Sequence, residues 1–257
     1  EAAKYFKMAA DKNYTRAMYD YGLMLRDGEG IDENKKEAAK YFKMAADIDH
    51  VDAMYCYAEM LDKGDGIKKE AAKYYKLGAD YNDPACSYYY GMKLKDGEGV
   101  RKNKKEAAKY IQWAADEGYI DAMTLFSQLA NKGKGVPRNN ETSAYYLKMA
   151  ADKGDIDSMK SYAKIMDKGK KGLKKNKRES AAYFKKAADM GDVESMATLG
   201  SKFDNGDGIE EDKISAAKYY KMAADNDNVP SMYRLGVLKR QGIGVPIDKQ
   251  GSADLFK

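Results

Sequence analysis

A segment of ten residues, AAKYFKMAAD, occurs at 2–11 and returns unchanged at 38–47. Its closing triplet, Ala-Ala-Asp or once Gly-Ala-Asp, recurs in steps of 36, 33, 36, 36, 37 and 36 residues, with its aspartate at Asp11, Asp47, Asp80, Asp116, Asp152, Asp189 and Asp225. A unit of this length cannot bury its apolar face alone, so neighbouring units must stack against each other. The sequence therefore predicts an all-α solenoid, a single array of antiparallel helix pairs over residues 1–257.

Each unit contains two helical patterns, which we name helix B (EAAKYFKMAAD in the first unit) and helix A (RAMYDYGLMLRDG). In helix B, Ala3, Phe6 and Ala10 share one face at i, i+3 and i+7. Helix A keeps small or apolar residues in the columns of Ala17, Met18, Tyr21, Gly22 and Leu25. Fifteen helices are expected, with the last helix B incomplete at Lys257.

Capping residues mark the helix boundaries. One column of N-cap residues precedes helix B, at Asn34, Asn103, Asn139, Asn176, Asp212 and Asp248. A glutamate follows three residues after Asn34, Asn103 and Asn176, which resembles a capping box. After helix B comes a column of residue types that tolerate the left-handed conformation, at Asn13, Asp49, Asn82, Gly118, Gly154, Gly191 and Asp227.

Helix A ends in a Gly-x-Gly loop followed by Ile or Val in most units. The first glycine predicts a left-handed helix end, and the second predicts a tight reversal into helix B. A phosphate-binding loop would need a preceding strand and a fixed lysine, and an EF-hand would need a glutamate at its twelfth position. The sequence has neither pattern, so these loops are interpreted as structural turns.

These residues resemble the Sel1-like repeat family. Its pattern is carried by Ala17, Tyr21-Gly22, Gly28-x-Gly30-Ile31, Glu37-Ala38, Tyr41-Phe42 and Ala45-Ala46. The tetratricopeptide repeat is the nearest alternative, but it lacks the long Gly-x-Gly loop. The resemblance implies a right-handed superhelix whose concave side is lined by helix A. It also implies a scaffold or adaptor role with protein partners.

Some bacterial relatives carry paired cysteines and are linked to β-lactam hydrolysis. Here Cys56 and Cys86 lie in different columns, so neither disulfides nor that activity are carried over. One histidine, His50, is expected on the surface and is too little for a catalytic triad or a zinc site. No catalytic residue, cofactor or metal site is predicted, and we expect a protein that is not an enzyme.

Helix A also has variable columns, those of Arg16, Tyr19, Asp20, Leu23 and Arg26, which form one stripe. We expect this stripe to be free of packing and to bind a protein or peptide, because Tyr and Arg are enriched at interface hot spots. Replacing Tyr55 and Tyr88 by alanine should then leave melting nearly unchanged. The alternative is that the tyrosines fill the junctions between repeats. The candidate residues are Tyr19, Asp20, Tyr55, Glu59, Tyr88, Tyr89, Leu125, Lys160, Tyr233 and Arg234.

Lysines form a ladder on helix B, at Lys4, Lys40, Lys73, Lys109 and Lys218, beside Lys7, Lys43, Lys76, Lys148, Lys185 and Lys221. A nucleic acid is not the expected partner, because that stripe has no aromatic residues for base stacking and the 46 basic residues nearly balance 41 acidic ones. The favoured interpretation is a solvated face.

No run of about 18 apolar residues occurs, so no membrane insertion is expected. Few cysteines and no visible signal peptide favour the cytoplasm, although the chain opens within a repeat and an earlier segment is expected. The pattern does not define an oligomeric state. The second functional hypothesis is a structural subunit, a rigid spacer within a large assembly.

Overall fold

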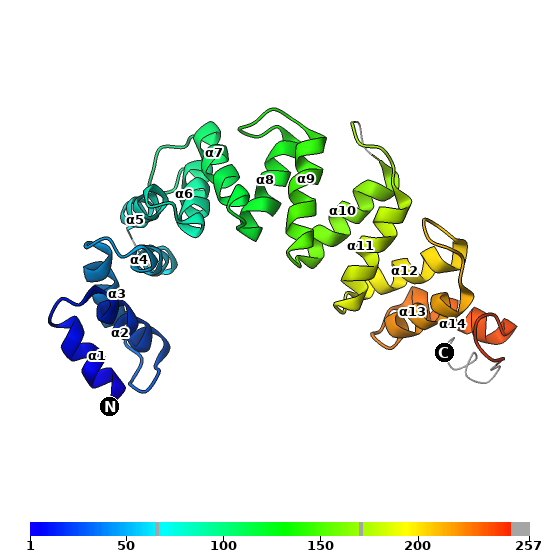
Figure 1. The fold of residues 1–257 in the computed structure, drawn as a ribbon, viewed down its shortest axis with the longest axis horizontal. Helices are drawn as coiled ribbons and strands as arrows, with labels where there is room; N and C mark the ends of the chain where they lie inside the picture. The colour runs from blue at the N-terminus through cyan, green and yellow to red at the C-terminus, as the bar shows by residue number, and fades with distance from the viewer. Residues whose placement is uncertain (65–66, 170–171, 248–257) are drawn as a thin grey trace. The chain divides into compact units, whose positions relative to one another are not determined.

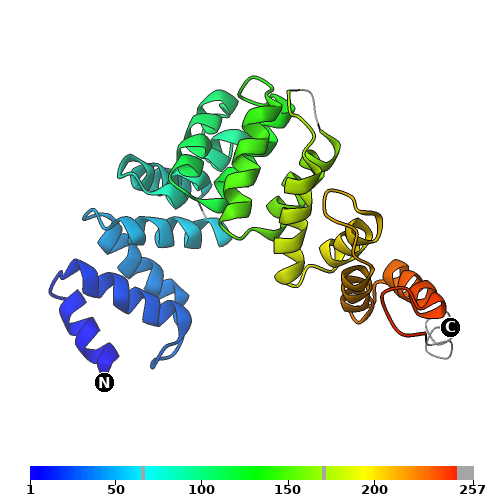
Figure 2. The same ribbon diagram turned by 45° about the vertical axis from the view of Figure 1, so that its right-hand side comes forward.

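The computed structural model describes residues 1–64, 67–169 and 172–247, and no β-strand occurs in these ranges. Fourteen helices follow one another there, and within each half of the chain successive helices pack as antiparallel hairpins (Figure 1, and Figure 2 in a second view). This confirms the predicted all-α solenoid of antiparallel helix pairs. The last helix B and its cap at Asp248 lie outside the described residues.

The chain divides into two compact units, Glu1–Pro137 and Arg138–Lys257. Odd-numbered helices are helix B and even-numbered helices are helix A. Unit 1 contains α1 (Ala2–Ala10), α2 (Thr15–Asp27), α3 (Lys35–Ala46), α4 (Val51–Lys63), α5 (Lys68–Asp80), α6 (Pro84–Asp96), α7 (Lys104–Asp116) and α8 (Ile120–Lys132). Unit 2 contains α9 (Asn140–Asp152), α10 (Ile156–Lys168), α11 (Lys177–Asp189), α12 (Val193–Asn205), α13 (Lys213–Ala224) and α14 (Val229–Gln241). The expectation of one array over residues 1–257 stays a prediction.

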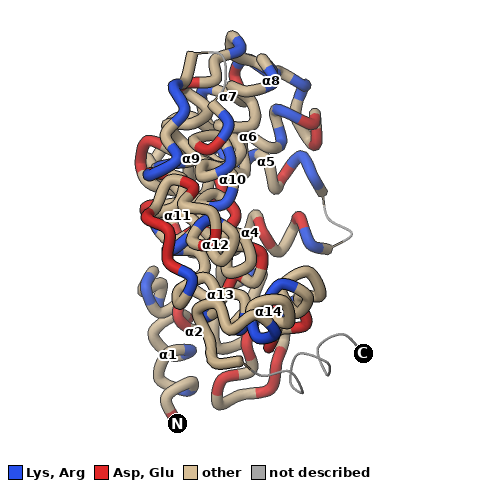
Figure 3. The backbone as a smooth tube through the Cα atoms, turned by 90° about the vertical axis from the view of Figure 1, so that its right-hand side faces the viewer, with Lys and Arg blue, Asp and Glu red and all other residues tan. Residues whose placement is uncertain are grey.

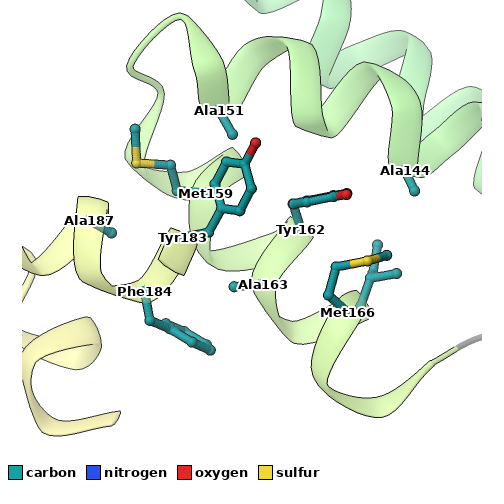
Figure 4. Close-up of a cluster of buried hydrophobic side chains, with 10 residues drawn as sticks. Ala144, Ala151, Met159, Tyr162, Ala163, Met166, Tyr183, Phe184 and Ala187 are labelled. Atoms are coloured by element: carbon teal, nitrogen blue, oxygen red, sulfur yellow. The ribbon is translucent and has the colours of Figure 1, made fainter. Parts of the chain in front are cut away.

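The constant columns form the core of each unit. In unit 2, side chains from α9, α10 and α11 pack into one buried cluster (Figure 4), which contains Ala144, Ala151, Met159, Tyr162, Ala163, Ile165, Met166, Tyr183, Phe184 and Ala187. The glycine column lets helix A lie directly on an aromatic ring of the next helix B. A Cβ at Gly22 would lie 2.7 Å from Cε1 of Phe42, and one at Gly200 would lie 2.8 Å from Cδ1 of Tyr220. A larger residue at either glycine would therefore overpack the core.

The described N-caps of helix B lie where the sequence predicts them. The side chains of Asn34, Asn103, Asn139, Asn176 and Asp212 each accept a backbone N–H from the first turn of their helix. The expected capping box differs in one respect. Glu37 accepts a hydrogen bond from the side-chain amide of Asn34 (3.2 Å), because the backbone N–H of Asn34 donates instead to the carbonyl of Leu25 (2.7 Å).

The helix ends also follow the sequence, with one correction. Non-glycine residues in the predicted left-handed column have φ between 60° and 68°, at Asn13, Asp49, Asn82 and Asp227. The first glycine of the loop is left-handed at Gly28, Gly97, Gly133, Gly206 and Gly242. Gly64 is extended instead, with φ −88°. Four residues, 64–67, join α4 to α5, whereas seven, 28–34, join α2 to α3.

The second glycine of the loop does more than reverse the chain. It lies against the first residue of a helix B, the one that comes two helices before the loop in the chain. A Cβ at Gly99 would lie 2.1 Å from the carbonyl oxygen of Lys68, and one at Gly208 would lie 2.2 Å from that of Lys177. Gly135 and Gly244 make the same approach to Lys104 and Lys213. These glycines thus set how closely a loop packs on the neighbouring helix.

Two buried lysines interrupt an otherwise apolar column of helix A, in which the other residues are Met24, Met60, Leu129, Ile165 and Leu238. Lys93 is 5% exposed and its ammonium pairs with the carboxylates of Asp62 and Glu98. Lys202 is 4% exposed and pairs with Asp167 and Asp207. Burial lowers the pKa of Lys93, but its two carboxylate partners outweigh this effect and the pKa is raised.

We expect Gly99→Ala to destabilise the chain more than Gly30→Ala. Both glycines have positive φ, 73° and 72°, so alanine costs about 1–2 kcal/mol at either position. At Gly30 the nearest atom to a Cβ is 3.8 Å away, whereas at Gly99 the clash with Lys68 adds about 1–3 kcal/mol. Thermal unfolding followed by circular dichroism measures the two variants, and equal losses of Tm would contradict this role of the second glycine.

Asp62→Asn should lower the free energy of unfolding by about 3 kcal/mol, because the ammonium of Lys93 then stays buried with one carboxylate fewer. Lys93→Met, which restores the residue type found at Met60, should leave stability unchanged or raise it. Urea unfolding of both variants gives the comparison. A loss of stability in Lys93→Met as large as in Asp62→Asn would show that the ion pair is needed for packing.

Candidate functional site

The predicted binding stripe is divided between the two units. Seven of its ten candidate residues lie in unit 1 and three, Lys160, Tyr233 and Arg234, lie in unit 2. All ten are half-buried or exposed in the structure. The structure brings Tyr55, Tyr88 and Tyr89 together in one group, and it places Tyr19 in another.

The largest group is a cluster of tyrosines in unit 1, which we call the five-tyrosine cluster: Tyr55, Tyr75, Tyr88, Tyr89 and Tyr119. Tyr89 is at its centre, with its ring stacked on Tyr75 (5.2 Å between centroids). The rings of Tyr55 and Tyr88 approach Tyr89 at 5.6 Å and 5.1 Å. Tyr119, which precedes α8, lies 5.2 Å from Tyr88. Tyr75 is buried and the other four rings are half-buried, so the cluster reaches the surface.

Tyr19 belongs to a separate aromatic group one helix pair earlier. Its ring stacks on the imidazole of His50 (4.7 Å between centroids) and lies 5.9 Å from Phe42. The guanidinium of Arg16 lies 5.5 Å from the centre of the Tyr19 ring. Burial raises the pKa of Tyr19 to about 12. The phenol therefore stays neutral at physiological pH.

One contact recurs along the helix-A stripe and corrects the expectation that its residues are free of packing. The residue two positions after the column of Ala17 contacts the N-cap residue of the next helix A. Tyr19 contacts His50 in this way, and Tyr88 contacts Tyr119. Lys160 forms the same contact as an ion pair with Asp192 (3.0 Å). The stripe is thus partly a junction between repeats, as the alternative interpretation holds.

His50 is the N-cap of α4, and its role differs from the surface histidine expected from the sequence. Its Nδ1 accepts a hydrogen bond from the backbone N–H of Ala53 (3.3 Å). The ring is half-buried under Tyr19. The sequence signal for the ring contacts at the repeat junctions is an aromatic side chain at the N-cap of helix A, which both His50 and Tyr119 provide. Tyr75 gives a weaker signal for the five-tyrosine cluster, because it is a tyrosine in a column that holds phenylalanine at Phe6 and Phe42.

Carboxylates surround the five-tyrosine cluster. Burial raises the pKa of Tyr55 and Tyr75 well above that of a free phenol, and the charge of Glu59 raises both further. Burial also raises the pKa of Tyr88, with Asp121 acting in the same direction. These rings therefore remain neutral, and the carboxylates of Glu59, which also pairs with Lys63, and of Asp121 favour a cation over the ring faces.

The other predicted residues are held by local contacts or lie exposed. Asp20 pairs with Arg16 (3.1 Å), and Glu59 pairs with Lys63 (2.8 Å). Leu125 is half-buried on α8. In unit 2, Lys160 is enclosed by Asp157 as well as Asp192, whereas Arg234 is exposed. Tyr233 is 57% exposed.

The lysine ladder of helix B takes part in contacts between helix pairs. Lys7, Lys43, Lys76, Lys185 and Lys221 each pair with the aspartate four residues later. Two of these aspartates also accept a hydrogen bond from a tyrosine of the next helix B, Asp11 from Tyr41 (3.0 Å) and Asp47 from Tyr74. Asp152 accepts in the same way from Tyr183 (2.7 Å). Basic and acidic residues are interspersed along the described chain (Figure 3).

The described residues contain no group of three or more His, Cys, Asp or Glu side chains placed to hold a metal ion. Cys56 and Cys86 are buried free thiols, and burial raises the pKa of Cys56 to about 11. Both thiols therefore stay protonated and unreactive.

Within the described ranges, no helix has both the length and the apolar character that crossing a bilayer requires.

The model of the Sel1 repeat matches the chain in consecutive segments that together span nearly all of it: 1–14, 15–50, 51–83, 84–119, 121–155, 156–192, 193–228 and 229–257. The Sel1 repeat fold is generally a protein-interaction scaffold, and the family is generally non-enzymatic. None of the curated proteins matches this sequence.

Solved structures show the same fold. The protective antigen c5321 of uropathogenic Escherichia coli, described as having an SLR fold, is similar with a TM-score of 0.86 and 22% identity. That match covers 99% of this chain and 55% of the antigen, so the chain spans about half of its length. A Sel1 repeat protein from Oxalobacter formigenes has a TM-score of 0.73 and 22% identity, with 98% of this chain and 74% of that chain covered.

The ring contacts change the expected effect of removing tyrosines from the stripe. Tyr89→Ala should lower the free energy of unfolding by about 2 kcal/mol, because each aromatic pair contributes about 0.5–1.5 kcal/mol beyond its buried area. Tyr89→Phe keeps the rings and should be nearly neutral, as should Tyr233→Ala. Thermal unfolding of the three variants tests this. A neutral Tyr89→Ala would mean that the five-tyrosine cluster does not stabilise unit 1.

Proposed function

Because the chain belongs to the Sel1 repeat family, we propose that it is a non-enzymatic scaffold or adaptor that binds a protein or peptide partner on its helix-A surface. The observation that supports this proposal most strongly is the five-tyrosine cluster. The ring of Tyr75 is buried and takes part in packing alone. The half-buried rings of Tyr55, Tyr88, Tyr89 and Tyr119 have faces or edges left for a partner.

Tyrosines arranged in this way suit the binding of a protein. Each ring is held by its neighbours, so little conformational entropy is lost when a partner packs on it. The hydroxyl groups can donate or accept hydrogen bonds, while the rings supply apolar contact area. The rings come from α4, α6 and the start of α8, so a bound segment would cross several helices of unit 1.

The charges around the cluster favour a basic partner. Glu59 and Asp121 raise the pKa of neighbouring phenols, which places negative potential at the rings. Arginine or lysine side chains bind over tyrosine faces and are further favoured by nearby carboxylates. Arg16 over Tyr19 shows such a contact within this chain. We therefore infer a protein or peptide segment that presents Arg or Lys.

A displayed library of random peptides, selected against the purified chain, tests this proposal. Selected peptides should be enriched in Arg and Lys, and a synthetic peptide from the selection should bind in calorimetry. Tyr88→Leu, which removes the ring face but keeps apolar volume, should weaken binding by about fivefold or more. Tyr88→Phe should retain most of the binding.

Tyr145→Ala is the matched control, because Tyr145 is 58% exposed on helix B of unit 2. It should leave the affinity unchanged. Equal binding by wild type and Tyr88→Leu would place the partner elsewhere. A chain that selects no peptide would favour the structural subunit over the adaptor.

A further inference from the structure

Unit 1 contains a second candidate site, a pocket of about 790 Å³ lined by residues from the end of α5, the start of α6 and one face of α7. It is separate from the five-tyrosine cluster and shares no residue with it. The residues that matter for its chemistry are Asn82, Ser87, Lys105, Lys109, Tyr110 and Trp113.

The pocket occurs where the chain departs from its own repeat. Ser87 occupies a column of helix A that holds methionine in the other units: Met18, Met54, Met123, Met159, Met196 and Met232. In unit 1, Met18, Met54 and Met123 are almost completely buried and fill the equivalent place. Ser87 is 1% exposed, and its hydroxyl has no hydrogen-bond partner. The shorter side chain leaves space and an unsatisfied polar group at this position.

Aromatic residues of α7 line the pocket. Tyr110 and Trp113 are three residues apart and therefore lie on the same face of the helix. Tyr110 is fixed by Tyr90, whose ring meets it edge-on at 4.9 Å. Trp113 is half-buried, in a column that holds methionine at Met8 and Met44. A planar apolar group can pack between such rings.

The charge at the pocket is positive. Lys105 and Lys109 are exposed, and neither forms an ion pair with a described residue. Other lysines of helix B, such as Lys43 and Lys76, pair with an aspartate. The one acidic residue at the pocket, Glu106, accepts a hydrogen bond from the side chain of the N-cap Asn103 (2.8 Å).

We propose that this pocket binds an aromatic carboxylate. The ring packs between Tyr110 and Trp113 in the space left at Ser87, and the carboxylate pairs with Lys105 and Lys109. The same chemistry is presented by a free small acid and by a peptide that ends in phenylalanine. The proposal is independent of the partner on the helix-A surface.

Trp113 is the single tryptophan of the chain, so its fluorescence reports on the pocket directly. The full chain is titrated with 3-phenylpropionate and with 3-phenylpropionamide. The acid should change the emission with saturation, and the amide should bind about tenfold more weakly because it lacks the charge. A tripeptide ending in Phe with a free carboxylate, and its C-terminal amide, form the second arm. Tighter binding of the tripeptide identifies a peptide C-terminus as the source, and tighter binding of 3-phenylpropionate identifies a small acid.

Ser87→Met restores the methionine of the column and keeps Trp113. It should raise Tm and abolish the response to 3-phenylpropionate. Lys109→Ala should weaken binding about five- to tenfold, whereas Lys73→Ala, the same column one repeat earlier, should not. Calorimetry confirms each affinity independently of fluorescence. Equal affinities for acid and amide, or an unchanged affinity in Lys109→Ala, would overturn the proposal, as would the absence of saturable binding.

Discussion

The structure depends on the close approach of successive helix pairs at positions where the chain carries almost no side chain. Gly22 lies against the ring of Phe42 on the next helix, and Gly99 lies against the carbonyl of Lys68, the first residue of α5, two helices earlier in the chain. The contact of Gly99 recurs at the same offset at Gly135, Gly208 and Gly244, so the helix pairs that carry it pack on their neighbours in the same way. At Gly30 the contact is absent, because the nearest atom to a Cβ there is Cε of Met24 at 3.8 Å, so a change in one column need not have the same consequence in each repeat.

The sequence predicted the fold well because its signals are local. The N-cap Asn34 and the left-handed Asn13 mark helix ends through contacts within a few residues. The candidate site was predicted less well because its contacts join residues about one repeat apart. Tyr88 and Tyr119, or Lys160 and Asp192, meet only because the repeat offset brings one column onto another. The buried pair of Lys93 and Asp62 was missed for the same reason.

Departures from the repeat pattern are where specific chemistry arises. Tyr75 places a hydroxyl-bearing ring in a column where Phe42 carries none, and it supports Tyr89 at the surface. Ser87 replaces methionine and leaves a pocket beside Trp113. Each change removes or alters packing in one unit while the constant columns keep the fold. Such an architecture can carry separate binding surfaces on one stack of helices.

The central claim is that the half-buried tyrosines of α4 and α6 are the partner-binding surface of unit 1. Hydrogen–deuterium exchange of the full chain, with and without a bound selected peptide, tests it most directly. The account predicts that protection increases at residues 51–63 and 84–96 and at the start of α8, with little change on α1 and α13. Protection confined to helix B, or to unit 2 alone, would contradict it.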